Sequence, residues 1–112
     1  MVKVYTEEWN GFQFRQPTYL DGHFEKYKFD LVKWVGHEPC EVIDAYTGKK
    51  KISNRYCFTI ATLIWDEKEL GFNFESCGTR YLEYRIDGLE KFILDFCEIM
   101  KQKFKKEKRI SF

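Results

Sequence analysis

The chain has 112 residues, of which 44% are hydrophobic and 33% charged, and its formal net charge is +1. A chain of this length forms one domain around one core, and this composition lies far from that of disordered chains. No apolar run approaches the roughly 18 to 20 residues that a membrane-spanning helix needs, so we expect no contact with a membrane. Residues 101–112 carry six bases and one acid. This excess predicts a mildly acidic body followed by a basic tail over 101–112.

The N-terminus and the cysteines together indicate a cytoplasmic protein. Glu7 and Glu8 stand where a signal peptide would need an apolar stretch. In a reducing compartment cysteines remain thiols. We therefore expect four reduced cysteines that bind no metal: Cys40, Cys57, Cys77 and Cys97.

Alternating apolar residues predict strands within residues 2–86, starting with two edge strands over 2–5 and 12–14. Residues 24–35 carry apolar side chains at alternating positions with charged residues between them, which is typical of a half-buried antiparallel strand. Pro39 marks a connection, because proline has no N–H to donate to a sheet. Residues 41–46 are expected to form a further strand that pairs nearby and ends at a turn around Gly48.

The clearest hairpin lies between residues 56 and 75. Residues 56–65 are apolar on both faces, with Phe58 and Ile60 pointing one way and Ala61 and Leu63 the other, which predicts a central strand. Residues 66–69 form a polar connection of hairpin length. Leu70, Phe72 and Phe74 then alternate with Gly71, Asn73 and Glu75 in a strand that is buried on one face.

Asp87 predicts the start of a helix, because Glu90 follows it at the spacing of a capping box. Apolar residues then recur at steps of three and four, as one buried helix face requires: Leu89, Phe92, Ile93, Phe96, Ile99, Met100 and Phe104. The helix should span about residues 88–105. The predicted fold class is α+β, a twisted antiparallel sheet of about five strands with one C-terminal helix packed on one face.

Catalytic signatures are absent from the sequence. His23 and His37 stand in no pattern that pairs them with a serine or cysteine nucleophile, and the seven glycines are not grouped to cradle a phosphate. Asp44 with residues 66–68 loosely matches the acids and lysine of metal-dependent nucleases, but 66–69 fits a solvated turn better. We therefore expect no enzyme activity and no cofactor.

The sharpest metal candidate combines His37 and Cys40 with Cys57 and Cys77, because two histidine or cysteine ligands three residues apart can share one zinc ion. Structural zinc sites usually have two such close pairs, and this chain has one. The pattern therefore favours a loop histidine and an inert thiol over a zinc site.

Aromatic residues make up 19% of the chain. Five of them occupy positions that strand and helix periodicity assigns to the core: Phe58, Phe72, Phe74, Phe92 and Phe96. Others are candidates for an exposed binding patch, because Trp and Tyr are enriched at interface hot spots: Trp9, Tyr19, Trp34, Tyr46, Tyr81 and Tyr84. Basic residues beside the central strand and in the tail complete the candidate set: Lys49, Lys50, Lys51, Arg55, Lys101, Lys105, Lys106, Lys108 and Arg109.

These residues support two functional hypotheses. The first is a small non-enzymatic binding module that acts through a protein–protein interface. The partner in this hypothesis is either another protein or a second copy of the chain, which would form a homodimer. The alternative is a single-stranded nucleic-acid-binding domain that uses sheet aromatics and the basic C-terminal tail. Nucleic acid binding requires basic and exposed aromatic residues on one continuous face, which distinguishes the two. The tail also has a simpler role, since bases near a helix C-terminus interact favourably with the helix dipole.

Overall fold

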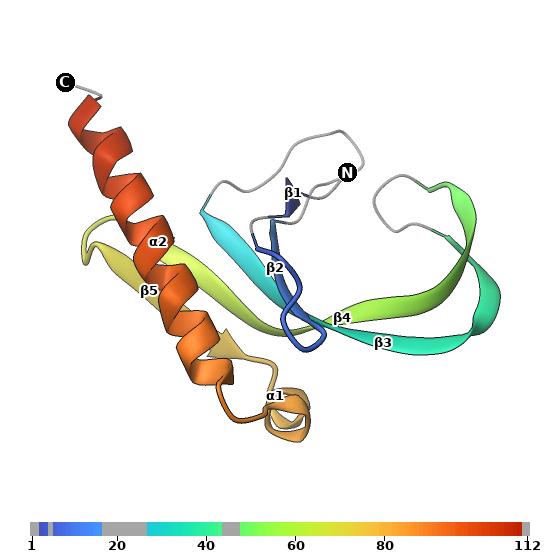
Figure 1. Cartoon of the computed structure of the whole chain (residues 1–112). Helices are drawn as coiled ribbons and strands as arrows, with labels where there is room; N and C mark the ends of the chain where they lie inside the picture. The colour runs from blue at the N-terminus through green and yellow to red at the C-terminus, as the bar shows by residue number, and fades with distance from the viewer. Residues whose placement is uncertain (1–2, 5, 17–26, 44–47, 111–112) are drawn as a thin grey trace.

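The computed structural model describes residues 3–4, 6–16, 27–43 and 48–110 (Figure 1). Its strands form one antiparallel sheet in chain order: β1 (Lys3–Val4), β2 (Phe12–Gln16), β3 (Lys28–Ile43), β4 (Lys50–Asp66) and β5 (Gly71–Ser76). Two helices follow, α1 (Thr79–Tyr84) and α2 (Leu89–Ile110). The predicted α+β class is confirmed, as four substantial strands and the two-residue β1 make a curled sheet on which α2 packs.

The strands β3 and β4 extend well beyond their neighbours. The last pair between β2 and β3 is at Lys33, and β5 pairs with β4 only from Ala61 onward. The remaining lengths of β3 and β4 form a two-stranded ribbon that curls away from the rest of the sheet (Figure 1). The prediction of two separate strands, over 24–35 and 41–46, is wrong within the described residues, because the single strand β3 continues through Pro39. The register shifts between Gly36 and Cys40, so a bulge accommodates the residue that cannot donate to the ladder.

A second irregularity lies at the centre of the sheet. Leu31 pairs with Ala61 and the next residue, Val32, pairs with Thr59, which leaves Ile60 as an extra residue on β4. A bulge of this kind interrupts strict alternation. Ile60 and Ala61 are consequently both buried, although alternation predicted opposite faces for them.

The core lies between one face of the sheet and α2. Phe14 stacks on Phe96 with ring centroids 4.0 Å apart, and Phe29 meets the same ring edge-on at 5.1 Å. The buried stripe of α2 follows the predicted spacing: Leu89, Ile93, Phe96, Met100 and Phe104. Two members of the predicted core were wrong, since Ile99 is 67% exposed and Phe74 is 44% exposed. Ile99 lies off the stripe, and Phe74 is on the last strand, where it contacts Tyr81 of α1.

The predicted start of α2 is confirmed to within one residue, but its cap and its C-terminal end differ from the prediction. The helix begins at Leu89 after Gly88, whose φ of 90° favours glycine. Among the described residues no backbone N–H of α2 donates a hydrogen bond to the Asp87 carboxylate, so the predicted cap does not form. The helix continues to Ile110, which makes most of the basic tail helical. In the described ranges, neither helix is long and apolar enough to cross a bilayer.

Candidate binding surfaces

Trp9 and Tyr81 are half-buried and pack against the core rather than forming an exposed patch. The Trp9 ring stacks on Phe92 at 5.3 Å and tilts against Phe12 at 6.0 Å. Tyr81 packs edge-on against Phe74 at 5.3 Å, and burial together with the charge of Glu90 raises its pKa. Two further aromatic candidates, Tyr19 and Tyr46, lie outside the described residues.

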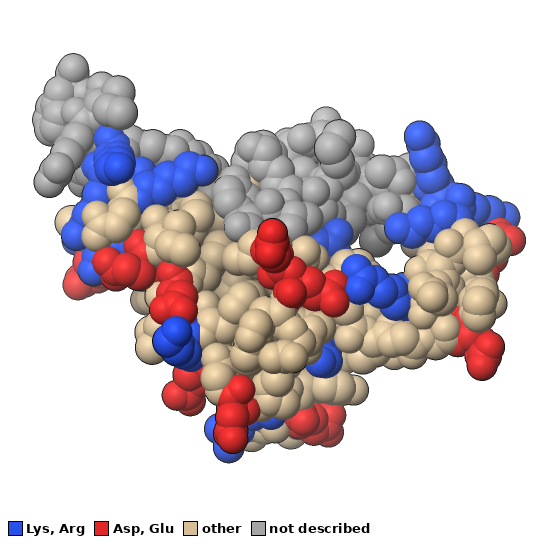
Figure 2. Space-filling view, viewed as in Figure 1, with Lys and Arg blue, Asp and Glu red and all other residues tan. Residues whose placement is uncertain are grey.

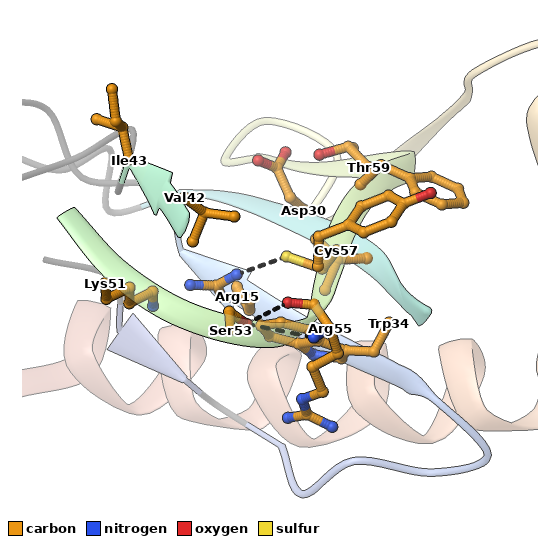
Figure 3. A pocket seen from close by; sticks show the side chains of 13 residues that line it. Arg15, Asp30, Trp34, Val42, Ile43, Lys51, Ser53, Arg55, Cys57 and Thr59 are labelled. Carbon is orange, nitrogen blue, oxygen red and sulfur yellow. Dashed lines mark hydrogen bonds between the residues drawn. The ribbon is translucent and has the colours of Figure 1, made fainter. Parts of the chain in front are cut away.

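Trp34 lies in a pocket of about 290 Å³ on the sheet face opposite α2 (Figure 3). Side chains alternate along β2, so Arg15 points into this pocket while Phe14 faces the helix. The guanidinium carbon of Arg55 lies 4.2 Å from the centre of the Trp34 ring, and that of Arg15 lies 5.4 Å from it. Such contacts are cation–π interactions. The structure therefore brings Trp34, Arg55 and Lys51 of the candidate set together, with Arg15 as a fourth member that the sequence did not suggest.

Much of the positive charge near this pocket already has a partner. Arg55 forms an ion pair with Glu8 at 2.7 Å, and Arg15 donates from Nη1 to the Cys57 sulfur at 2.8 Å. Asp30 adds a carboxylate to the pocket lining. The two guanidinium groups also occupy space over the indole that a stacked base would need. The pocket can attract an acidic group, but Trp34 is not a free stacking platform.

A row of ring contacts runs along β4 to α1. Tyr84 meets Phe58 edge-on at 5.0 Å, Phe58 lies 6.1 Å from Tyr56, and Tyr56 lies 5.3 Å from His37. The Arg80 guanidinium stands over the Phe58 ring at 5.1 Å. Tyr56 is 50% exposed, whereas Tyr84 is half-buried. This row includes Tyr84 from the candidate aromatic patch and His37 from the candidate metal site.

Apart from Arg55 in the Trp34 pocket, the basic candidates of the described residues belong to two regions, the far part of the ribbon and α2. Figure 2 shows Lys and Arg side chains at both ends of the molecule. Exposed Lys49 and Lys50 lie at the far end of the ribbon, where Lys50 pairs with Glu41 at 3.4 Å. The other group lies on α2, where Lys101 and Lys105 are half-buried and Lys106 is exposed. Lys108 and Arg109 also fall within α2, but their side chains are outside the described set. The bases of α2 lie on the sheet face opposite the Trp34 pocket, because Phe14 packs on α2 while Arg15 of the same strand lines the pocket. In the view of Figure 2 the Lys and Arg side chains at the two ends form no continuous face.

The free edge of β5 and the adjoining flank of α2 form a surface that the sequence did not suggest. Among the described strands β5 has β4 as its single neighbour, so its outer edge carries unpaired backbone groups. A groove of about 450 Å³ lies between this strand and the helix, lined in part by Phe72, Leu94 and Cys97. Leu94 is 66% exposed. Its place on the outer part of an amphipathic helix was the available signal, but which strand would lie beside it depended on the fold.

The proposed zinc ligands are not brought together. His37 Nδ1 lies 3.6 Å from the Cys40 sulfur, but Cys57 lies beside Arg15 and Cys77 directly follows β5. No group of three potential metal ligands occurs in the described ranges. His23 and Asp44 lie outside them. Asp66 accepts hydrogen bonds from the backbone N–H groups of Lys68 and Glu69, as expected of a turn.

Thiol reactivity should differ among the cysteines. Burial raises the pKa of Cys97 from 9.0 to about 11, whereas Cys40 and Cys77 are exposed. Because the folded state holds this proton to higher pH than the unfolded state, Cys97 stabilises the fold below pH 9 and loses that contribution as pH rises toward 11. At about pH 10 we expect iodoacetamide to modify Cys97 much more slowly than Cys40 or Cys77, because the thiolate is the nucleophile.

Peptide mass spectrometry over a time course measures these rates. In denaturant all four cysteines should react alike, which controls for the reagent. Equal rates in the folded protein would contradict the raised pKa of the half-buried Cys97 thiol. The intact mass of the native protein should match four free thiols without metal, and a bound zinc ion or a deficit of two mass units per disulfide would overturn the predicted reduced state.

Comparisons with protein-family models, curated proteins and solved structures found no match to the chain. Inference about function consequently depends on three surfaces of the described residues. These are the Trp34 pocket, the aromatic row from His37 to Tyr84, and the flank formed by β5 and α2.

Proposed function

We propose that the chain is a non-enzymatic module that acts through a protein–protein interface. The observation that carries this proposal is the unpaired edge of β5 beside the exposed Leu94. Exposed sheet edges pair readily with another chain, and their main-chain hydrogen bonds supply affinity without any catalytic group. An exposed leucine beside such an edge adds apolar area that association removes from water.

The edge has few of the features that protect strands from pairing. Proteins blunt free edges with prolines, lysines, bulges or a covering segment. β5 contains neither proline nor lysine, its pairing with β4 is regular over all six residues, and Glu75 is its one charged residue. No described residue outside β4 forms a strand pair with it. The edge is therefore suited to a specific partner.

A second candidate function, single-stranded nucleic acid binding, is favoured by the Trp34 pocket. There Arg15, Lys51 and Arg55 share one sheet face with an aromatic ring, which is the combination such proteins use. Two observations weigh against it: the guanidinium groups already cover part of the ring, and the bases of α2 lie on the opposite side of the sheet. We rank it below the protein interface for these reasons.

A salt series separates the two functions. For the protein interface we expect self-association that survives rising salt, because buried apolar area and backbone hydrogen bonds are weakly screened. For the alternative we expect oligonucleotide affinity that falls steeply, with a slope of about 0.7 in log affinity per phosphate contacted. Light scattering and fluorescence anisotropy with a labelled single-stranded oligonucleotide, run on the same samples, measure both quantities.

The variant Lys51→Glu supplies a matched control, because Lys51 lines the pocket and lies far from β5 in the sheet. It should weaken any oligonucleotide binding and leave self-association unchanged. A monomer that binds the oligonucleotide tightly and in a salt-dependent manner would overturn the protein-interface proposal. A salt-resistant dimer without an anisotropy change would exclude the second candidate.

A further inference from the structure

We infer that the partner on this flank is a second copy of the chain, with the two β5 strands paired antiparallel across a two-fold axis. This inference rests on the proposed function and adds the partner and the geometry. The axis runs perpendicular to the sheet, so the two sheets join into one and both α2 helices lie on the same face. A two-fold axis reverses direction, so the helices run antiparallel.

The charges on the flank of α2 that faces β5 are complementary to themselves in this arrangement. Leu94, Cys97 and Lys101 line the groove beside β5. Glu90 lies four residues before Leu94 and Lys105 lies four residues after Lys101, so helical spacing places both on the same flank. Asp95 and Glu98 also line the groove. On this flank Glu90, Asp95 and Glu98 lie in the first half of α2, where Lys91 pairs with Asp95. Lys101 and Lys105 lie in the second half, so the first half is net acidic and the second half is basic. Antiparallel helices therefore bring the acidic half of each copy alongside the basic half of the other.

The apolar side chains lie where the axis would pass. Leu94 and Cys97 stand between Glu90 and Lys101 on α2, and the same groove reaches Phe72 on β5. Burial of Leu94 against its symmetry mate removes an apolar side chain from water on both copies. A parallel arrangement of the helices would instead place lysines beside lysines. The charge order thus favours the two-fold over a head-to-tail contact.

The dimensions of the flank suit a stable dimer. Six strand residues extend about 20 Å, and the 22 residues of α2 extend about 33 Å alongside. A standard interface buries about 800 Å² on each partner. One strand edge with one helix flank of these lengths provides a surface of that order.

Charge reversal with mixing tests the geometry. Glu90→Lys with Glu98→Lys makes the flank net basic, and Lys101→Glu with Lys105→Glu makes it net acidic, while the Lys91–Asp95 ion pair is unchanged in both. Each double variant should dimerise at least about tenfold more weakly than the native chain at low ionic strength, because like charges face each other in both halves of the symmetric interface. A mixture of the two should form a heterodimer with affinity near that of the native dimer. Sedimentation velocity of the separate and mixed samples measures this.

A matched control is Lys103→Glu with Lys106→Glu, which makes the same charge change on another side of α2. This variant should dimerise like the native chain. Thermal melts establish that every variant is folded. If the native chain self-associates but both reversed variants associate equally well, the β5 and α2 geometry is wrong and the proposed protein interface stands at another surface. If the native chain is monomeric and binds the oligonucleotide, both proposals fail.

Discussion

Phe96→Ala is expected to lower the free energy of unfolding by about 3 to 5 kcal/mol, the cost of truncating a large core side chain and leaving a cavity. Phe96 is 3% exposed and lies at the centre of the contact between α2 and the sheet. Its ring stacks on Phe14 of β2 and meets Phe29 of β3 edge-on. Deleting the ring therefore removes packing from three elements at once. Urea titration followed by far-UV circular dichroism measures the loss.

Asp95→Ala is the control, because it changes the neighbouring residue on the exposed side of the same helix. Its one described ion pair, to Lys91 at 3.5 Å, joins two exposed side chains and contributes little. We expect a midpoint close to that of the native chain. Similar midpoints for the two variants would mean that α2 presents a different face to the sheet.

Leu94→Glu is expected to weaken self-association by about a hundredfold or more, because a symmetric interface buries two copies of an unpaired carboxylate beside Glu90 and Glu98. The substitution should leave the monomer folded, since Leu94 is 66% exposed and does not belong to the buried stripe. Analytical ultracentrifugation over a concentration series gives the dissociation constant.

Ile99→Glu is the control, because Ile99 is 67% exposed and so nearly matches Leu94 in exposure. Five residues separate the two positions, which turns Ile99 about 140° around the helix from Leu94 and away from the β5 flank. This variant should retain the native dissociation constant. Equal weakening by both substitutions would indicate that general helix surface polarity, rather than the β5 flank, controls association.

Local periodicity predicted the elements whose partners are close in sequence. The β4–β5 hairpin and the stripe of α2 from Leu89 to Phe104 follow from alternation and from steps of three and four. The fold class followed from the same patterns. Periodicity did not predict α1, because its six residues bury none of their side chains and so leave no apolar repeat.

Features that depend on pairing between strands could not be read from one strand alone. Pro39 indicated a connection, but Pro39 lies within β3, where a register shift between Gly36 and Cys40 accommodates it in the pairing with β4. The bulge that buries both Ile60 and Ala61 is likewise a property of the pair. Among the candidate site residues, Trp34 and Arg55 came together, whereas Trp9 and Tyr81 are half-buried against the margin of the core. The flank of β5 and α2 was missed because an edge is defined by the neighbours that a strand lacks.

The ribbon of β3 and β4 gives the domain an uneven distribution of cooperativity. After Lys33 no residue of β3 pairs with β2, and before Ala61 no residue of β4 pairs with β5. A two-stranded segment of this kind is marginally stable in isolation. Opening of the ribbon therefore breaks few interactions with α2 and leaves the helix-covered core intact. Such an opening is a sub-global unfolding event with a lower free energy than complete unfolding. Backbone amides at the far end of the ribbon will accordingly exchange with solvent through local openings, while those paired over Phe29 and Leu63 report the global stability of the chain.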